Sequence, residues 1–448
     1  MASLEEIVQL AKKRGFVFPS SEIYDGCAGI YDYGPLGVEL ANNIKQQWWS
    51  SMVRKRQDIV GLDAGIVMHP SVWEASGHTT GFTDPVVVCK KTGKRYRADH
   101  LLEDAGVAAD ERMSQEEFCA IFEQHKEKIQ VCDPDDLGTP TFQNLLVSAG
   151  IGEGEVYLRG ETCQGIYVNF KQVLDSMHMK LPFGIAQIGK AFRNEISPRQ
   201  FLFRTREFEQ MEMQYFCHED TSSEHFAAFL ASRQEALVAL GLRKENLRVT
   251  EHKNLVFYAS AASDIEYHYP FGWKELEGVH DRGTYDLTQH ALHAKERLTY
   301  FDQDRNEHIV PAVVETSIGV GRLFLALLAD AYAVETLDDG TERTVLRFKP
   351  SIAPMQVAVL PLFRREGQQR IAHRIVEDLA KHVSAYYDDT GAVGKRYRRA
   401  DEIGTPFAVT VDHETEENET VTVRDRDSMK QDRVAIEDLA SYVNERIN

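Results

Sequence analysis

No stretch of this sequence approaches the roughly 20 consecutive apolar residues that a membrane-spanning helix needs. The N-terminus also lacks the charge order of a secretory leader, which places basic residues before an apolar run. Here Glu5 and Glu6 come first and the basic run 12–14 follows. This order suits the helix dipole, and Ser3 has capping-box spacing to Glu6. We therefore expect an amphipathic first helix in a cytoplasmic protein that makes no membrane contact.

Closely spaced cysteines are absent. Zinc sites and disulfide frameworks usually show C-x-x-C or similar spacing, and the six cysteines form no such pair. They are Cys27, Cys89, Cys119, Cys132, Cys163 and Cys217. Even the basic, turn-rich stretch that follows Cys89 contains no second cysteine. The sequence thus predicts six reduced thiols and no structural zinc.

Positive charge is in short supply. Lysine and arginine total 51 against 70 aspartates and glutamates, so the net charge is −19. A nucleic-acid-binding protein is expected to be basic overall, and the balance counts against such a ligand. Binding needs only a local basic surface, however, and basic clusters occur at 54–56, 90–97 and 395–399. Each cluster alone is more often a solvated face than a binding site.

The chain's 448 residues are enough for two or three domains. A polar stretch with two prolines at 336–354 separates two patterns. The first 345 residues alternate strand-like segments with long helices, which predicts a large antiparallel sheet with helices around it. Residues of about 98–150 are acidic and helix-like and are expected to form an insertion. Residues 350–448 show short apolar strands and helical spacing, including a hairpin across 407–425, and predict a compact α/β domain.

Residues 190–216 (KAFRNEISPRQFLFRTREFEQMEMQYF) read as a strand, an exposed loop and a second strand. Successive side chains of a strand point to opposite faces, so Phe208, Gln210 and Glu212 share one face. This face is too polar for a core. The loop carries Arg199, Arg204 and Arg206, and guanidinium groups above a polar sheet suit a polyphosphate. A solvent-facing hairpin laced with ion pairs is the structural alternative.

Residues 313–332 (VVETSIGVGRLFLALLADAY) read as a strand that passes through Gly319 and Gly321 into an apolar helix opened by Arg322. Glycines at such a turn let a ligand approach the backbone. The helix N-terminus favours anionic phosphate. A simple tight connection is the commoner reason for such glycines.

Together, Arg-x-Glu on a strand and a distant helix-opening arginine resemble motifs 2 and 3 of class II aminoacyl-tRNA synthetases. The helical stretch 37–57 and the strand that ends at Pro70 resemble motif 1, which builds the dimer interface in that family; a long surface helix is an equally good interpretation. Further segments resemble the dimeric type of glycyl-tRNA synthetase in order and spacing, namely FVFPSSEIYDGCAGIYDYGPLG, HPSVWEASGHTTGFTDP, KRYRADHL, LRGETCQGIYVNF, REFEQMEMQYF and TVTVRDRDSMKQDRV.

The resemblance implies ATP-dependent attachment of glycine to its tRNA through a glycyl-adenylate. It implies that Arg193, Glu195 and Arg322 act in catalysis. Arg193 would hold the α-phosphate and the glycine carboxylate, Glu195 the adenine amino group, and Arg204 the γ-phosphate. The residues implied for ATP are Arg193, Asn194, Glu195, Phe203, Arg204, Thr205, Arg206, Glu207, Phe208, Glu275, Leu276, Gly319, Val320, Gly321 and Arg322.

Other roles follow from the same resemblance. Phe208 and Arg322 would sandwich the adenine, and Glu275 would contact Mg²⁺. Glutamates around the amino acid would hold its ammonium group and leave no room for a methyl group. The residues implied for glycine are Arg97, Glu161, Phe208, Glu209, Gln210, Met211, Glu212, Glu315, Thr316, Ser317, Ile318 and Gly319. The C-terminal domain resembles an anticodon-binding domain, and the implied partners are ATP, Mg²⁺, glycine, its tRNA and a second copy of the chain.

The sequence departs from the family pattern at four positions, Gly160, Cys163, Thr316 and Gly321. Three other functions are weighed. A sister class II synthetase for histidine, proline or threonine would share the fold. A non-enzymatic relative of the polymerase-accessory kind would be expected to lose the ATP arginines, which this sequence keeps. An enzyme that adenylates an amino acid for another carrier would not need the C-terminal domain.

Overall fold

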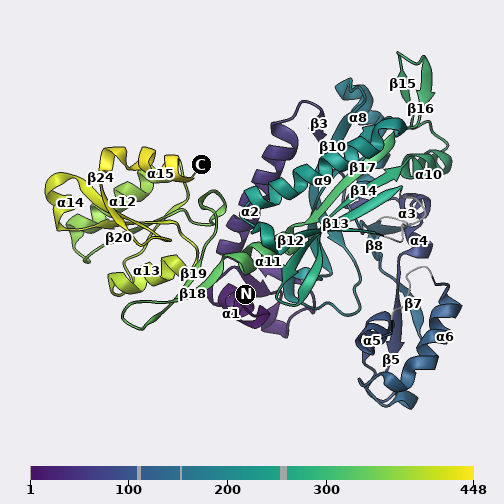
Figure 1. Cartoon of the computed structure of the whole chain (residues 1–448), viewed down its shortest axis with the longest axis horizontal. Coiled ribbons are helices and arrows are strands. Elements are labelled where there is room, and N and C mark those ends of the chain that lie inside the picture. The colour runs from purple at the N-terminus through teal and green to yellow at the C-terminus, as the bar shows by residue number, and fades with distance from the viewer. Residues whose placement is uncertain (1, 108–112, 152–153, 253–259, 448) are drawn as a thin grey trace.

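A computed structural model describes residues 2–107, 113–151, 154–252 and 260–447. The chain forms a central body, a C-terminal domain on one side of it and a small lobe on the other (Figure 1). Helix α1 (Leu4–Arg14) begins with the predicted capping box, because the Ser3 side chain accepts from the backbone of Glu6 and the Glu6 side chain accepts in return. No helix among the described residues is long and apolar enough to cross a membrane.

The central body is built on a seven-stranded sheet in the order β12-β13-β14-β17-β11-β10-β3. Its strands are β12 (Leu247–Glu251), β13 (Ala261–Tyr269), β14 (Gly272–Gly283), β17 (Ala312–Gly319), β11 (Glu207–Cys217), β10 (Phe183–Phe192) and β3 (Ile59–Gly61). Every pairing is antiparallel except the one between β10 and β3. The antiparallel sheet predicted from the sequence is confirmed.

The two faces of this sheet differ. Helices α2 (Pro35–Trp49), α9 (Ser222–Ala239) and α11 (Val320–Ala331) pack on one face and bury the main hydrophobic core there. On the other face, α7 (Cys163–Val168), α8 (Phe170–Met177) and α10 (Tyr285–Ala294) enclose a second core around Phe183 and Phe216. These three helices cover only part of that face, and the remaining part is polar.

Strand alternation assigns side chains to the two faces. On β11, Met211 and Met213 belong to the main core, whereas Gln210 and Glu212 point to the polar side. On β14, Glu266 of β13 pairs with Glu275 and Ile265 pairs with Glu277, so Leu276 is an extra residue, a β-bulge. A bulge shifts the alternation by one residue. Side chains on either side of Leu276 can therefore face the same side of the sheet although their numbers differ in parity.

The small lobe holds the segment predicted as a helical insertion. It contains helices α5 (Ala98–Asp104) and α6 (Gln115–His125), but it also contains a three-stranded sheet of β6 (Arg95–Arg97), β5 (Thr83–Val88) and β7 (Thr141–Asn144). Two of these strands precede residue 98. The lobe is thus a mixed unit with its own small core around Leu102 and Phe122. Strand β9 (Gly154–Leu158) pairs with β4 (Val67–Met68) of the body on one side and with β8 (Val147–Ile151) on the other.

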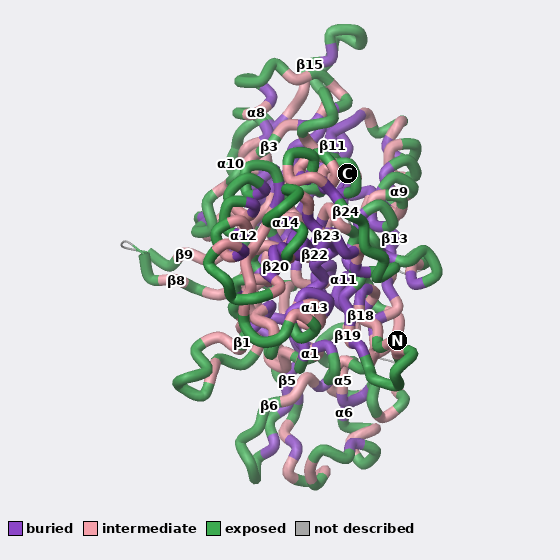
Figure 2. Tube along the Cα trace, turned by 90° about the vertical axis from the view of Figure 1, so that its left-hand side faces the viewer, coloured by how far each residue is buried: buried purple, intermediate pink, exposed green. Residues whose placement is uncertain are grey.

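The C-terminal domain is a five-stranded sheet in the order β21-β20-β22-β23-β24. Its strands are β21 (Ala385–Tyr387), β20 (Val357–Pro361), β22 (Phe407–Val411), β23 (Thr420–Asp425) and β24 (Gln431–Ala435). Helices α12 (Glu366–Leu379) and α15 (Leu439–Ile447) pack with the core on one face, and α13 (Val393–Glu402) packs on the other. Figure 2 shows that the buried residues concentrate along β20, β22 and β23 while α12 and α14 are largely exposed.

One local prediction for this domain is wrong. Strands β22 and β23 do pair antiparallel, but the acidic segment between them is helix α14 (His413–Asn418) rather than a turn. The side chains of Asp412 and Thr415 satisfy each other's backbone N–H groups in a capping box. This cap starts a helix in a segment whose acidic composition alone indicates only exposure.

Asp401 on α13 joins the C-terminal domain to the hairpin of β18 (Tyr332–Thr336) and β19 (Glu342–Leu346). Its carboxylate accepts from Arg343 of β19 at 2.7 Å and from Arg424 of β23 at 2.9 Å. Arg343 and Asp401 are almost completely buried. Buried charges need partners, because an unpaired ion in the interior is strongly destabilising.

Replacing Asp401 by alanine leaves two buried guanidinium groups without their shared carboxylate. We expect the free energy of unfolding to fall by about 3–5 kcal/mol, measured by urea denaturation of the full chain. Asp378→Ala is the matched control, because Asp378 pairs with Lys381 across solvent and both side chains are exposed. An Asp401→Ala midpoint equal to that of the control would contradict the role given to this network.

Candidate active site

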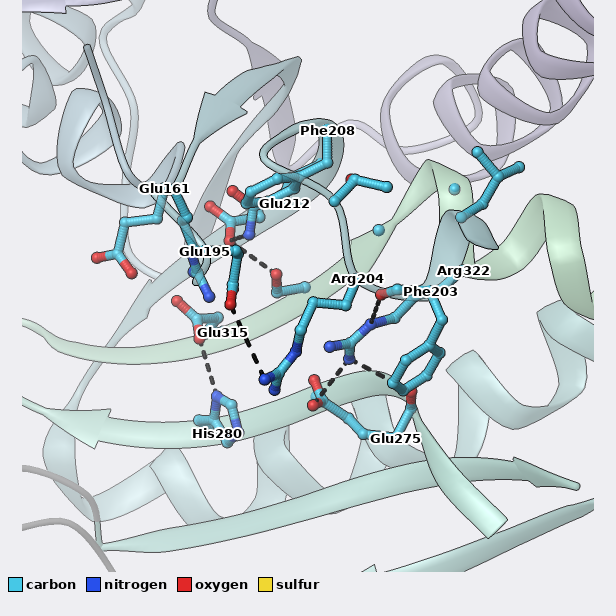
Figure 3. Close-up of a pocket in the computed structure, with 18 of the residues that line it drawn as sticks. Glu161, Glu195, Phe203, Arg204, Phe208, Glu212, Glu275, His280, Glu315 and Arg322 are labelled. Atoms are coloured by element: carbon cyan, nitrogen blue, oxygen red, sulfur yellow. Dashed lines mark hydrogen bonds and ion pairs between the residues drawn. The ribbon is translucent and has the colours of Figure 1, made fainter. Parts of the chain in front are cut away.

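A cavity of about 400 Å³ lies over the polar face of the central sheet. Its lining comes from β11, β13, β14, β17 and the start of α11, from the loop between β10 and β11, and from the segments that carry Glu161 and His252. The lining residues are Glu161, Arg193, Glu195, Leu202, Phe203, Arg204, Thr205, Phe208, Gln210, Glu212, His252, Ala262, Glu275, Gly278, His280, Arg282, Glu315, Ser317, Gly319, Gly321 and Arg322. The pocket has an acidic end and an arginine-rich end (Figure 3).

Strand register brings the acidic end together. Glu212 on β11 lies opposite Ser317 on β17, and Glu315 on β17 lies opposite His280 on β14. The side chains of these four residues all line the cavity. The sequence prediction that Phe208, Gln210 and Glu212 share a face agrees with this placement. The third carboxylate, Glu161, comes from the segment that precedes α7.

Each carboxylate at this end has its own set of donors. Glu212 accepts from Ser317 Oγ at 2.7 Å, from Gln210 Nε2 at 2.9 Å and from the hydroxyl of Thr162. Glu315 lies 2.9 Å from His280 Nδ1 and 3.3 Å from Arg282. All of these groups except Thr162 line the cavity, where a small ligand could contact their polar atoms. The acidic end is therefore prearranged rather than formed by loose surface side chains.

Glu161 is fixed from behind. Its Oε1 lies 3.3 Å from His78 Nε2 and 2.9 Å from Gln164 Nε2. The thiol of Cys163 donates to the same oxygen at 3.0 Å. Cys163 is one of the positions that depart from the family pattern, and here it contributes a donor that an alanine could not supply.

The three carboxylates have different proton affinities. Burial acts to raise the pKa of Glu315, but Arg282 and His280 lower it to about 2. Burial likewise opposes ionisation of Glu161, and His78 nevertheless holds its pKa well below the ordinary value. Burial raises the pKa of Glu212 to about 7, and the charges of Glu315 and Glu161 add to that effect. Glu212 is thus the carboxylate whose charge depends on what enters the pocket.

The other end of the cavity is rich in arginine. Arg322, at the start of α11, lies 2.8 Å from Glu275 Oε2 and stacks over the ring of Phe203 at 4.5 Å. Arg204 lies 3.9 Å from Glu195 Oε2. In Figure 3 the contacts of Arg322 with Glu275 and Phe203 lie right of centre, and the dashed line between Arg204 and Glu195 lies nearer the middle. Arg193 and Arg322, more than a hundred residues apart in sequence, line one cavity.

Arg193 and Glu195 lie between the two ends. The Nε of Arg193 donates to the carbonyl of Gly160 at 3.0 Å, and its guanidinium group lies 5.3 Å from the ring centroid of Phe208. Glu195 is buried, and its Oε2 has no hydrogen-bond partner among the described residues, although two arginines lie within 4.0 Å. A buried acceptor of this kind is normally satisfied by a bound group.

Ten residues implied for ATP or glycine do not line the cavity. Met211, Leu276, Ile318 and Val320 belong to the main core on the opposite face. Thr316 is buried on that same face, where Glu209 also pairs with Lys45 at 3.0 Å. The remaining four are Arg97, Asn194, Arg206 and Glu207. The ten residues alternate with or flank the lining residues. The resemblance therefore points to segments that border the cavity, and the strand period determines which of their side chains face it.

Two of the remaining four support the cavity wall. Arg206 donates to the carbonyl of Glu195 at 2.8 Å and to that of Ala28 at 3.1 Å. Arg97 lies 2.9 Å from Asp84 and 4.0 Å from Glu195. Both guanidinium groups therefore position the segment that carries Glu195. Asn194 hydrogen-bonds Leu145 through its backbone, and Glu207 pairs with Lys190.

Several lining residues were not anticipated from the sequence. His280 and Arg282 sit at alternating positions on β14, and Arg282 also pairs with Asp286 at 2.8 Å. Their alternation is visible in the sequence (VHDRG), but nothing local indicates which strand lies beside them. His252 lines the cavity as well, and His78 supports Glu161 from outside it.

The arrangement suits a small cation beside a polyanion. A compact group with a positive charge fits beside Glu212, whereas the arginines at the other end suit phosphate oxygens. The unsatisfied acceptor of Glu195 and the aromatic ring of Phe208 lie between these ends. One ligand with an ammonium group and one with phosphates would meet near Arg193.

Comparisons with known proteins agree with this geometry. A family model described as the tRNA synthetase class II core domain (G, H, P, S and T) matches residues 150–331, and one described as an anticodon binding domain matches residues 356–446. A solved prolyl-tRNA synthetase from Cryptosporidium parvum, complexed with L-proline and AMP, has a similar fold. Its TM-score is 0.61 at 16% identity, over 98% of this chain and 74% of that one. The fold and the site define a class II tRNA synthetase.

Full-length relatives narrow the class. The glycine–tRNA ligase of Geobacillus thermodenitrificans is 48% identical over 461 residues, which cover 100% of this chain and 98% of the relative. That of Clostridium acetobutylicum is 48% identical over 458 residues, or 99% of each chain. The chain therefore belongs to the glycine–tRNA ligase family, and the resemblance noted in the sequence is confirmed.

The pKa of Glu212 can be tested without any ligand. We expect one carboxyl group to titrate near pH 7 in the free protein, because burial and two neighbouring carboxylates favour its protonated form. Infrared difference spectra between pH 5.5 and 8.5 should show its carboxyl band disappear as pH rises, beside the band of Asp84, whose pKa burial raises to about 6. The Glu212 band alone should be missing in Glu212→Gln, and both bands should be present in Glu74→Gln, a control at an unrelated position. A Glu212 that stays ionised at pH 5.5 would contradict the electrostatic assignment.

Proposed function

We propose that this chain joins glycine to its tRNA with ATP, in two steps through a glycyl-adenylate. The observation that carries the proposal is the single cavity in which a carboxylate-lined hole adjoins an arginine-rich end. The chain is 48% identical to glycine–tRNA ligases, which favours glycine over histidine, proline or threonine as the amino acid substrate. The presence of Arg193 and Arg322 in one cavity speaks against a non-enzymatic relative, which would not need both.

The acidic end would bind the glycine ammonium. Glu212 and Ser317 offer acceptors at its centre, and Glu161 and Glu315 add negative charge within the same cavity. His280 and Arg282 neutralise much of the charge of Glu315, so Glu212 would be the main counter-ion. A missing methylene alone lets an enzyme discriminate between two substrates by about 1–3 kcal/mol. Here any side chain larger than that of glycine would have to displace buried charged groups, so larger amino acids would be excluded sterically.

The arginine-rich end would bind ATP. Arg193 would contact the α-phosphate and the glycine carboxylate, and Arg204 would reach the γ-phosphate. Glu195 would accept a hydrogen bond from the adenine amino group, because its buried Oε2 has no hydrogen-bond donor among the described residues. Phe208 would stack on the base from one side. Arg322 currently stacks on Phe203 and pairs with Glu275, so its stacking on adenine would replace a contact that already holds the guanidinium group flat.

Glu275 would also contact Mg²⁺. Magnesium at a nucleotide site is usually held by one or two carboxylates together with phosphates and water. Glu275 fits this pattern, since it lines the cavity beside the arginines and its side chain is about half exposed. The ion would neutralise phosphate charge when bound. With the ion bound, the carboxylate of Glu275 would contact both Mg²⁺ and Arg322.

The chemistry needs little from acid or base groups. One oxygen of the glycine carboxylate forms a bond to the α-phosphorus, and the bond from that phosphorus to the β-phosphate oxygen breaks, so pyrophosphate leaves with the electron pair. A terminal ribose hydroxyl of the tRNA then attacks the glycyl carbonyl, and AMP leaves. The protein's contribution is to position the reactants and to stabilise charge that develops at the phosphorus.

The tRNA would lie along both domains, with its acceptor end at the cavity and its anticodon at the C-terminal domain. The basic run at 395–399 contributes little to that binding, because Arg396 is buried and donates to backbone carbonyls. Arg399 pairs with Asp388. The enzyme would act as a cytoplasmic homodimer, with α2 at the interface as the motif 1 resemblance implies.

Glycine selectivity and its pH dependence can be measured together by ATP–pyrophosphate exchange. Exchange should depend on glycine and not on alanine, serine or proline. The ammonium binds the ionised form of Glu212, whose pKa is raised to about 7. The KM for glycine should therefore be constant above pH 8 and rise as pH falls, by about tenfold for each unit below 7. The pH dependence should vanish in Glu212→Gln, and exchange with alanine at the glycine rate would contradict the proposal.

The ATP assignment has its own test. Arg193→Ala and Arg322→Ala each remove a charge that would stabilise the transition state, and losses of about 100-fold or more in the exchange rate are expected. Arg248→Ala is a suitable control, since Arg248 stacks on Trp273 outside the cavity. Circular dichroism would establish that the variants fold. Wild-type exchange rates in both cavity variants would exclude this use of the pocket.

A further inference from the structure

Three parallel strands of the C-terminal domain end at one edge of its sheet. The chain leaves β20 through α12 to reach β21 on one side, and later returns through α13 to β22 on the other side. Helices α12 and α13 cover opposite faces. The crevice between the carboxyl ends of β20 and β22 is therefore a topological switch point, where open α/β sheets bind their ligands. In Figure 1 it lies toward α14, at the end of the domain away from the central body.

Two aromatic rings occupy this switch point. Phe363 follows β20 and remains 47% exposed, and His413 follows β22. Their ring centroids lie 5.4 Å apart with planes inclined by 38°. The guanidinium group of Arg365 lies 5.3 Å from the centroid of Phe363. The backbone N–H of Leu362 donates to the carbonyl of Val411 at 2.7 Å, which ties the two loops together.

An exposed phenylalanine between a histidine and an arginine contributes little to the domain core. The core of this domain lies along the strands, around Val359 and Val409, and does not include Phe363. Aromatic rings and guanidinium planes at a sheet edge are the groups on which unpaired nucleobases stack. Such stacking does not depend on the nucleotide sequence, because every base presents an aromatic face.

The charge around the rings is mixed. The loop before α12 brings the exposed Arg364 and Arg365 to the rings. Arg364 lies 3.5 Å from Asp389, whereas the guanidinium group of Arg365 lies over Phe363. Further along α12, Arg370 and Arg374 line one hollow with Glu416 and Glu419, so their charge is opposed there. Arg365 is therefore the cation that would attract the phosphate of a base stacked on Phe363.

We propose that Phe363, His413 and Arg365 form a stacking platform for unpaired bases of an RNA loop. The RNA is the tRNA anticodon loop, an identity that rests on the proposed function and on the match of residues 356–446 to an anticodon binding domain. Arg365, beside Phe363, contacts the phosphate of the stacked base. The platform thus deepens the proposed function by giving the C-terminal domain the residues through which it contacts RNA.

The platform is tested by the affinity of the full chain for a glycine tRNA transcript. Phe363→Ala removes the ring on which one base would stack, and its Kd for the transcript is expected to be about tenfold higher than that of the wild type. Phe363→Trp keeps a ring and should bind as the wild type does. His413→Ala should weaken binding in the same direction. With a transcript whose anticodon-loop nucleotides are abasic, wild type and Phe363→Ala should bind equally weakly, because the group that the ring contacts is then gone.

Phe301→Ala is the matched control. Phe301 is also an exposed phenylalanine beside a histidine, His308, with ring centroids 5.0 Å apart. It lies on the hairpin of β15 (Tyr300–Asp302) and β16 (Glu307–Ile309) of the central body. Its substitution should leave the Kd unchanged. The platform is overturned if Phe363→Ala binds the intact transcript as the wild type does. It is also overturned if Phe301→Ala weakens binding equally, or if Phe363→Ala weakens binding to the abasic transcript as much as to the intact one.

Pyrophosphate exchange separates this inference from the proposed function, because exchange needs no tRNA. Phe363→Ala should exchange at the wild-type rate, which also shows that the chain is folded. A wild-type chain that binds the transcript through Phe363 but gives no glycine-dependent exchange would refute the function and leave the platform standing. Normal exchange with an unchanged Kd in Phe363→Ala would refute the platform alone.

Discussion

Three carboxylates converge on one small buried space, and the rest of the site is arranged around keeping them there. Burying even one unpaired charge is strongly unfavourable. The protein meets this constraint by placing donors behind two of the three, with Arg282 and His280 against Glu315 and the imidazole of His78 against Glu161. Among the described residues, the hydrogen-bond donors to Glu212 are neutral, and its pKa is raised to about 7. The space therefore lacks one positive charge, which under the proposed function the ammonium group of glycine would supply.

The same constraint explains why the lining comes from so many elements. No short segment can hold three carboxylates and their cations on one face, because neighbouring like charges on a strand repel. Three adjacent strands share the task. Glu212 of β11, Ser317 of β17 and His280 of β14 all face the cavity, and the side chains between them on each strand point to the other face. The bulge at Leu276 adds Glu275 to the cavity while Gly278 and His280 keep their orientation.

Sequence alone could predict what depends on local period and local chemistry. The shared face of Phe208, Gln210 and Glu212 follows from strand alternation, and the first helix follows from its capping box. The family resemblance supplied Glu161 and Arg322, but it indicated whole runs such as 208–212, in which Glu209 and Met211 face away from the cavity. The supporting groups could not be predicted. His78 lies more than eighty residues from Glu161, and the bulge at Leu276 is invisible without its partner strand.

Net charge misleads in this chain for a related reason. Many of its arginines are consumed inside the fold, where Arg343, Arg396, Arg424 and Arg426 are buried and bonded to carbonyls or carboxylates. Buried and paired, they offer no charge to a polyanion at the surface, so the count of basic residues in the sequence overstates those that RNA could reach. At the switch point of the C-terminal domain, the exposed Arg365 beside Phe363 would then be a local attraction on an acidic surface. An acidic protein that binds RNA gains orientation in this way, because most of its surface repels the phosphate backbone and only a defined site attracts it.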